Sequence, residues 1–434
     1  MDEISKKRMI KKLLKNEIFR NTLIYCFGAA FIGGIQFLLV PVYTRVMSPE
    51  TYGILELLNT FIQIITLILA MGLPQVLFIF YYHRPEPERN NLAGEIFLLY
   101  FIVATPVVFV LIMSASVLNQ VVFSNTAKEI YIILAILFAY LSVFQQTFLN
   151  VLKAQRKAVL LTALQIGYGM IMILSIIYLV YFRRMGIFGV LSPKVGITII
   201  FLCLVVVFSY RLIKSLKVKL GFQKARDFLS VSLPIIPGVL AVWILNSADR
   251  WVLLKYGYVR ELGLYAVAYK FGILTQILLD SFAGAYVPEL YDMYSKDEMN
   301  GEKFNMLFLK RYFIFGIPAT IIGILLLKMV FNFIVGQEYY QAFKYIPFVI
   351  SGYFMYGAMS FAHKLVHYHK RTMAVVFVNI VAAVFNLVTN IVFVKIYGPI
   401  AAAVTTLLSF ALLFLLMFWL RTIEVRKLRG GLTG

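Results

Sequence analysis

The chain has 434 residues, of which 61% are hydrophobic and only 14% are charged, and its mean hydropathy is +0.86. A soluble protein of this length needs more polar surface, so the composition predicts a polytopic membrane protein. The apolar runs are long and do not alternate with polar residues, which favours an all-α fold over a β-barrel. The net charge of +21 does not indicate a nucleic-acid partner, because Lys and Arg cluster between the apolar runs, where cytoplasmic loops collect them.

The first segment, residues 1–17, is basic and amphipathic, and we expect it in the cytoplasm against the membrane surface. Anionic membrane lipid is its expected partner, and a helix that binds another protein is the alternative. No small-residue cleavage site follows, so the first apolar run is predicted to be a retained helix. The two cysteines, Cys26 and Cys203, lie within apolar runs and indicate neither disulfides nor a metal site.

About twelve apolar runs are long enough to cross a membrane. They are expected near 18–46, 50–82, 90–115, 127–152, 157–182, 186–214, 226–256, 261–292, 304–334, 339–366, 371–397 and 399–424. A strongly basic segment near the middle divides them into two sets of six. The predicted parts are an N-terminal bundle over 18–214, a cytoplasmic linker over 215–225, a C-terminal bundle over 226–424 and a cytoplasmic tail over 425–434. Basic loops on the inside place both termini in the cytoplasm, and only the corner at Arg183 and Arg184 opposes this orientation.

The two halves carry an internal repeat. At an offset of 210 residues, Gln36 falls on Asn246, Arg45 on Lys255 and the pair Tyr52-Gly53 on Leu262-Gly263. A second match pairs Met185-Gly186-Ile187 with Tyr397-Gly398-Pro399. Six spans return the chain to its starting side, so the repeat is predicted to be parallel.

Polar side chains form stripes on three helices of this repeat. In the run 50–82 they recur every three or four residues, which places them on one helix face: Tyr52, Glu56, Asn59, Gln63 and Thr66. The equivalent face of the run 261–292 carries Tyr269, Gln276 and Asp280, and one face of the run 226–256 carries Asn246, Asp249 and Arg250. Lys270 is a further charged residue inside the run 261–292. Charged groups at membrane depth are costly, so these stripes predict a shared hydrophilic cavity. Lys194 and Lys328 stand alone in their helices and are weaker candidates for it.

Each charged position also has a simpler explanation. Asp249 and Arg250 are able to neutralise each other, and Arg45 and Lys255 are able to extend to the membrane interface. His363 and His367 have the i, i+4 spacing of metal ligands, but no third ligand is evident, so no metal is expected. The sequence has no nucleotide-binding loop, nucleophile elbow or other catalytic motif, so no catalytic residue is predicted.

Three stretches carry a family resemblance: FLLVPVYTRVMSPETYGILELLNT, NSADRWVLLKYGYVRELGLYAVAYK, and the region from AFKYIPF at 342–348 to VTTLLS at 404–409, with Asn386 and Asn390. They resemble the bacterial polysaccharide repeat-unit flippases, the Wzx-like O-antigen and capsule transporters. These belong to the superfamily that also holds multidrug antiporters and the lipid II flippase. The resemblance implies two six-helix bundles in a V around a central cationic cavity. It also implies a multi-pass protein of the bacterial cytoplasmic (inner) membrane that flips a polyprenyl-diphosphate oligosaccharide outwards by alternating access.

That substrate suggests roles for the polar residues. Cationic groups are needed for the diphosphate, and Arg binds phosphate oxygens in a bidentate manner. The expected diphosphate contacts are Arg250, Lys270, Arg45 and Lys255, and the expected sugar contacts are Tyr52, Asn59, Gln63, Tyr269, Gln276 and Asn246. The candidates for coupling to H⁺ or Na⁺ are Asp249, Asp280 and Glu56, with charge balance of neighbouring basic residues as the alternative for the two aspartates. No other cofactor is expected.

Two other functions stay open. A multidrug antiporter is expected to have an acidic cavity for cationic drugs, whereas the polar positions here are mainly basic. A membrane glycan polymerase is expected to carry catalytic residues on a sizeable outer loop, and the predicted outer loops are short. Other polysaccharide-assembly proteins are further expected partners of a flippase.

Overall fold

The computed structural model describes all residues except 1–27, 29–30, 32, 35–36, 209–219 and 431–434. After a helical segment that includes Phe37–Val46, the first half contains α2 (Pro49–Ala70), α3 (Leu73–His83), α4 (Glu86–Met113), α5 (Ala115–Val121), α6 (Glu129–Ala154), α7 (Ala158–Ile177) and α8 (Phe188–Phe208). The second half contains α10 (Phe222–Ser232), α11 (Ile236–Lys255), α12 (Val259–Lys296), α13 (Glu298–Ile334), α14 (Ile346–Tyr368), α15 (Thr372–Tyr397) and α16 (Ile400–Gly430). The described part of the chain has no strand, so the predicted all-α fold is confirmed.

Ten helices within the described ranges are long and apolar enough to cross a membrane. The 23-residue α14 and the segment through Val46 fall outside these ten, and with them the count agrees with the prediction of about twelve. α4 and α13 expose many of their apolar side chains, such as Phe109 and Phe333, as expected for helix faces that contact lipid. The chain is therefore a multi-pass membrane protein.

The sequence predicts one helix over 50–82, but the structure has two helices there, α2 and α3. Met71 and Gly72 both have positive φ, at 49° and 69°, and they separate α2 from α3. A Cβ on Gly72 would lie 2.6 Å from the carbonyl oxygen of Ser232, just ahead of α11. A glycine is needed here because only it combines positive φ with so close an approach of another backbone segment. Hydropathy does not register such a break, since both residues suit an apolar run.

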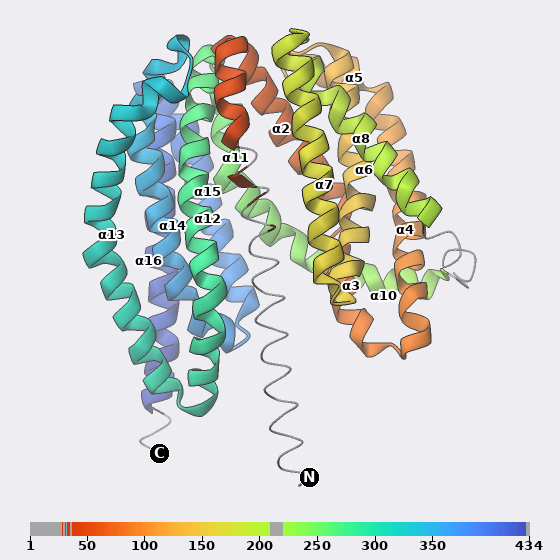
Figure 1. The fold of residues 1–434 in the computed structure, drawn as a ribbon. Coiled ribbons are helices and arrows are strands. Elements are labelled where there is room, and N and C mark those ends of the chain that lie inside the picture. Colours follow the sequence, from red (N-terminus) through yellow and green to blue (C-terminus); the bar gives the residue numbers. More distant parts are fainter. Residues whose placement is uncertain (1–27, 29–30, 32, 35–36, 209–219, 431–434) are drawn as a thin grey trace.

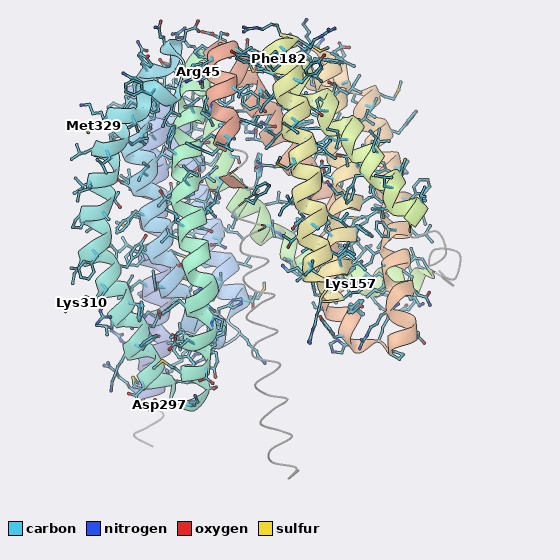
Figure 2. All side chains as sticks on the ribbon, in the orientation of Figure 1. Arg45, Lys157, Phe182, Asp297, Lys310 and Met329 are labelled. Atoms are coloured by element: carbon cyan, nitrogen blue, oxygen red, sulfur yellow. The ribbon has the colours of Figure 1, made fainter. Side chains whose placement is uncertain are left out.

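The helices form two bundles that converge at the upper end of Figure 1 and diverge towards the lower end. Helices α2 to α8 make up the N-bundle, and α11 to α16 make up the C-bundle. We call the upper end, where α2 and α12 begin, the closed end, and the lower end, where α16 terminates, the open end. Figure 2 labels Arg45 and Phe182 near the closed end and Lys157 and Asp297 near the open end.

The closed end is built on a contact between the two repeats. A Cβ on Gly53 would lie 3.1 Å from the backbone nitrogen of Gly263, and a Cβ on Gly263 would lie 3.1 Å from that of Gly53. The contact is reciprocal, and it joins residues that the sequence repeat pairs at an offset of 210. The adjacent pair Glu50 and Arg260, also 210 residues apart, forms an ion pair at 3.3 Å. The repeat predicted from the sequence is thus present in the structure as a near two-fold relation between α2 and α12.

Helix α10 precedes the C-bundle in sequence but is attached to the N-bundle. Glu95 of α4 is 1% exposed and pairs with Arg84 at 2.8 Å and with Lys224 of α10 at 2.7 Å. Phe228 of α10 is buried under the Arg84 guanidinium. In Figure 1, α10 runs across the lower part of the N-bundle before the chain enters α11. The expected linker over 215–225 lies partly outside the described residues.

Candidate functional site

A pocket of about 420 Å³ lies within the N-bundle, next to α12 of the C-bundle. Its walls come from the helical segment Phe37–Val46 and from α2, α6, α7 and α8, and one lysine from α12 completes them. The polar lining consists of Tyr43, Tyr52, Glu56, Asn59, Gln63, Gln145, Gln165, Tyr168, Lys194 and Lys270. A volume of this size, with an apolar wall and a few polar groups, is typical of a small-molecule site.

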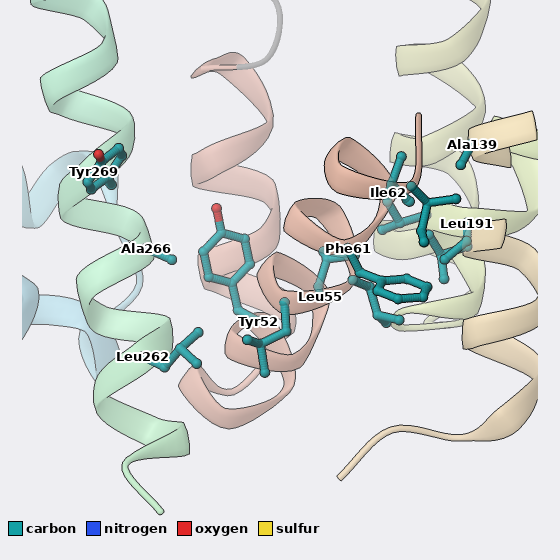
Figure 3. Packing of buried hydrophobic residues seen from close by; sticks show 14 of the residues in the cluster. Tyr52, Leu55, Phe61, Ile62, Ala139, Leu191, Leu262, Ala266 and Tyr269 are labelled. Atoms are coloured by element: carbon teal, nitrogen blue, oxygen red, sulfur yellow. The ribbon is translucent and has the colours of Figure 1, made fainter. Parts of the chain in front are cut away.

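The stripe predicted on one face of α2 supplies one wall of this pocket. Tyr52, Glu56, Asn59 and Gln63 all line it, as their spacing of three or four residues requires. Thr66, the last member of the predicted stripe, is not part of the lining. Another face of α2 is apolar: Figure 3 shows Phe61 directed towards Leu191 in the core of the N-bundle, whereas Ile62 joins the pocket lining. The amphipathic pattern therefore orients α2 with its polar face towards the pocket.

The charged side chains of Glu56, Lys194 and Lys270 line the pocket and are connected to one another, two of them directly and the third through an amide. Lys270 pairs with Glu56 at 3.1 Å, and Asn59 Nδ2 donates to the same Glu56 oxygen at 3.1 Å. Lys194 Nζ donates to Asn59 Oδ1 at 2.7 Å and lies 5.5 Å from the centre of the Phe138 ring. Two lysines against one carboxylate give the pocket a positive net charge, which favours neutral or anionic ligands over cations.

The hydroxyl group of Tyr52, a residue of the pocket lining, has no hydrogen-bond partner among the described residues. The side chain is fully buried. Figure 3 shows the Tyr52 ring in the space between α2 and α12, on the side of Leu262 and Ala266. A buried hydroxyl without a partner costs free energy, so it marks a place where a ligand or water is able to bind.

The other predicted polar residues form a separate cluster inside the C-bundle. Asp249 is 1% exposed and accepts hydrogen bonds from the Tyr265 hydroxyl, from Thr406 Oγ1 at 3.4 Å and from the Arg250 backbone at 2.8 Å. Arg250 is 5% exposed, pairs with Asp249 at 3.3 Å and donates to the Asn246 carbonyl at 2.6 Å. Its guanidinium stacks 4.2 Å above the Tyr269 ring. The expected mutual neutralisation of Asp249 and Arg250 is therefore present.

The structure does not bring this cluster to the pocket. Asn246, Asp249, Arg250 and Tyr269 are absent from the pocket lining, and Lys270 is the residue through which α12 contributes to it. The single shared cavity expected from the three stripes is thus divided into an N-bundle pocket and a C-bundle cluster. Sequence spacing places residues on a helix face but does not say which neighbouring helix covers that face.

The remaining candidates lie elsewhere. Arg45 is exposed at the closed end and donates to the Phe333 carbonyl at 2.8 Å, and Lys255 is exposed in the last turn of α11. Gln276 is half-buried on α12 and does not line the pocket, and the Asp280 side chain lies outside the described residues. The His363 and His367 rings are 6.0 Å apart, and the described residues contain no group of three His, Cys, Asp or Glu that could hold a metal.

Several residues of the pocket lining are not among the site residues predicted from the sequence. Tyr43 on the segment Phe37–Val46, Gln145 on α6 and Gln165 and Tyr168 on α7 line the pocket, and Lys194 on α8 is only a weak candidate from the sequence. Gln165 and Tyr168 have i, i+3 spacing in an otherwise apolar run, which is a signal that was available. Gln145 and Lys194 are the pocket's lone polar contributions from their helices, so only the tertiary structure identifies them.

Solved structures share this arrangement of two helical bundles. One is the lipid II flippase MurJ in an inward closed conformation, with a TM-score of 0.67 and 17% identity, covering 94% of this chain and 87% of that one. Another is an inward-facing multidrug resistance transporter of the MATE family and the MOP superfamily, with a TM-score of 0.71 and 13% identity, covering 92% and 96%. This chain therefore shares its fold with both of these solved proteins.

The sequence itself identifies the family. Residues 18–294, more than half of the chain, match the profile of the polysaccharide biosynthesis proteins, and the chain belongs to that family. A curated relative, the Lsg locus putative protein 1 of Haemophilus influenzae, is 21% identical over 350 residues, which cover 77% of this chain and 81% of the relative.

Proposed function

We propose that this protein flips a polyprenyl-diphosphate-linked oligosaccharide across the bacterial cytoplasmic membrane by alternating access, for surface polysaccharide biosynthesis. The observation that carries the proposal is the N-bundle pocket, where amides and phenols suited to sugar hydroxyls surround two lysines and one carboxylate. The family supports the pathway, and a flippase for lipid II has the same fold. The proposed cargo therefore agrees with the chemistry of the pocket, with the family of the chain and with the fold that it shares with a lipid II flippase.

The proposed orientation places the open end in the cytoplasm. Exposed basic side chains lie at that end, at Lys153 in the last turn of α6, at Arg156 and Lys157 in the loop that follows, and at Lys370 and Arg371 between α14 and α15. Basic loops are retained on the cytoplasmic side, so both termini are proposed to be cytoplasmic and the closed end to face outwards. Cargo would enter between the bundles from the inner leaflet and leave when the closed end opens.

The proposed ligand contacts follow the pocket. Lys270 is proposed to bind the diphosphate, and Tyr52, Asn59 and Gln63 to bind sugar hydroxyls, because all four line it. Arg250 would contact a phosphate only after leaving Asp249 and Asn246, so we assign it to a later step of the cycle. Arg45 and Lys255 are proposed to act at the outer mouth, where both are exposed.

Asp249 is the proposed site of coupling to H⁺ or Na⁺. Its carboxylate is buried in the C-bundle, within hydrogen-bond distance of Tyr265 and Thr406. An ionisable group at membrane depth is a natural position for a transported ion. With Asp249→Asn, transport by the purified protein in liposomes is expected to lose its dependence on the ion gradient.

The decisive experiment is deletion of the gene in cells whose sugar-assembly genes remain intact. Accumulation of polyprenyl-diphosphate oligosaccharide in the inner leaflet, with loss of surface glycan, supports the flippase. Normal surface glycan with raised sensitivity to cationic drugs would instead establish the multidrug antiporter. Repeat units that reach the outer leaflet but fail to polymerise would indicate a polymerase.

A further inference from the structure

Glu56 lies between two lysines that belong to different bundles. Its carboxylate is 4% exposed and pairs with Lys270 of α12 at 3.1 Å. On its other side, the Asn59 amide donates to Glu56 and accepts from Lys194 of α8, at 3.1 and 2.7 Å. Lys194 forms no ion pair with a carboxylate within the described ranges. A single amide therefore separates the buried carboxylate from a second cation that has no counter-ion of its own.

The two lysines differ in how they move relative to Glu56. Glu56, Asn59 and Lys194 all belong to the N-bundle, on α2 and α8, and so keep their relative positions when the bundles part. Lys270 belongs to the C-bundle and lies one to two helical turns beyond the glycine contact of Gly53 with Gly263. Separation of α2 from α12 at the closed end therefore removes Lys270 from Glu56 and leaves Lys194 close by. A buried carboxylate that loses its cation is strongly destabilised, so the nearest remaining cation is drawn to it.

We propose that Glu56 exchanges Lys270 for Lys194 when α2 and α12 separate, which makes Lys194 a positioning residue of the transport cycle. With the closed end shut, the Glu56–Lys270 pair joins the two bundles. With the closed end open, the Glu56–Lys194 pair compensates the same buried charge inside one bundle. The exchange keeps the carboxylate neutralised in both states, so neither state is penalised by an isolated charge. The proposal goes beyond the proposed function, because it requires only that the bundles part at this end, whichever cargo is carried.

The test measures the opening of the closed end without any cargo. The purified full chain, with Cys26 and Cys203 replaced by Ala, carries spin labels at Lys128→Cys and Lys395→Cys. These exposed positions lie at the start of α6 and the end of α15, near the closed ends of the two bundles. The distance distribution by double electron–electron resonance in lipid nanodiscs then gives the ratio of shut to open protein.

The exchange predicts opposite effects for the two lysines. Lys270→Met removes the partner of the shut state and is expected to shift the ratio towards open about tenfold or more, since a buried charge loses its cation. Lys194→Met removes the partner of the open state and is expected to shift it towards shut. In a Glu56→Gln background, both substitutions are expected to have no further effect, and Lys194→Arg is expected to keep the unsubstituted distribution.

Two results would overturn the proposal. One is an unchanged distribution in either lysine variant, and the other is an effect of Lys194→Met that persists in the Glu56→Gln background, as a purely structural role would give. Lys194→Gln serves as a second variant if Lys194→Met does not yield monodisperse protein. Because no cargo is present, these results are independent of whether the deletion experiment supports a flippase or an antiporter.

Discussion

Gly263 of α12 lies so close to Pro49 of α2 that a methyl group on the glycine would be 1.9 Å from the Pro49 carbonyl oxygen. The atom it would meet belongs to the backbone, so no side-chain rotation relieves the contact. The two helices are thus able to meet at the closed end only because glycine occupies this position.

Gly263→Ala is therefore expected to prevent the closed end from shutting. Overpacking of this kind costs roughly 1–3 kcal/mol or more, and here it acts only on the state in which α2 and α12 touch. The spin-label distance between residues 128 and 395 is expected to lengthen, and transport is expected to fall sharply. Gly196→Ala on α8 is the matched control, because nothing lies within 4 Å of its added Cβ. An unchanged distance in Gly263→Ala would show that the closed end does not depend on this contact.

Tyr52→Phe is expected to reduce transport without lowering the stability of the protein. The Tyr52 hydroxyl has no partner among the described residues, so its removal leaves the melting temperature unchanged or slightly raised. If the hydroxyl binds a sugar, transport is expected to fall by about fivefold, equivalent to ~1 kcal/mol for one hydrogen bond. The control is Tyr265→Phe, which removes a hydrogen bond to buried Asp249 and is expected to lower stability by about 1–3 kcal/mol. Loss of stability in Tyr52→Phe would indicate a structural role instead.

The buried ion pair at the open end of the C-bundle is expected to be important for stability. Arg421 of α16 donates to Glu302 of α13, and Glu302 also accepts from the Tyr294 hydroxyl at 2.6 Å. Both partners are less than 10% exposed, so Arg421→Met leaves a buried carboxylate and is expected to cost roughly 3–5 kcal/mol. Thermal unfolding in detergent measures the loss. Lys296→Ala, which breaks an exposed pair with Asp292, is expected to change stability by less than ~1 kcal/mol.

His369, in the loop between α14 and α15, is expected to make stability depend on pH. Burial disfavours its charged ring, but Glu298 at 3.0 Å and Glu424 at 2.9 Å outweigh burial and raise the pKa of His369 above 6.5. A raised pKa stabilises the fold fully below the unfolded value near 6.5, and this contribution is lost as pH rises through the folded pKa. Arg371 and Lys427 also pair with Glu424.

The melting temperatures of the unsubstituted protein and of His369→Gln are therefore expected to differ more at pH 6 than at pH 9. Glu298→Gln is expected to reduce this pH-dependent difference, because it removes one of the two carboxylates that hold the proton on the ring. A difference that stays constant with pH would mean that the pKa of the His369 ring is the same in the folded and the unfolded protein.

Much of the fold follows from the sequence because it depends on local patterns. Long apolar runs indicate the spanning helices, and the repeat at an offset of 210 residues correctly pairs Gly53 with Gly263. The spacing of Tyr52, Glu56, Asn59 and Gln63 correctly identifies the face of α2 that lines the pocket.

The parts that the sequence does not reveal depend on packing between helices. Whether Arg250 faces a cavity or bonds Asp249 is decided by the Tyr265 and Tyr269 rings, which come from another helix. Lys194 joins the pocket because Asn59 of α2 lies opposite it, at a sequence separation of 135 residues. Neither relation leaves a periodic signal in the chain.

The pair of Glu50 and Arg260 also bears on how such a chain came to exist. A contact between equivalent residues of two similar halves has the geometry of a two-fold homodimer interface. In a homodimer of identical six-helix chains, the position shared by Glu50 and Arg260 would hold two like charges, which repel each other. Opposite charges at this position require halves that are free to diverge, and covalent fusion after gene duplication provides that freedom. The ion pair at the closed end is thus one that a symmetric dimer of identical chains is unable to form.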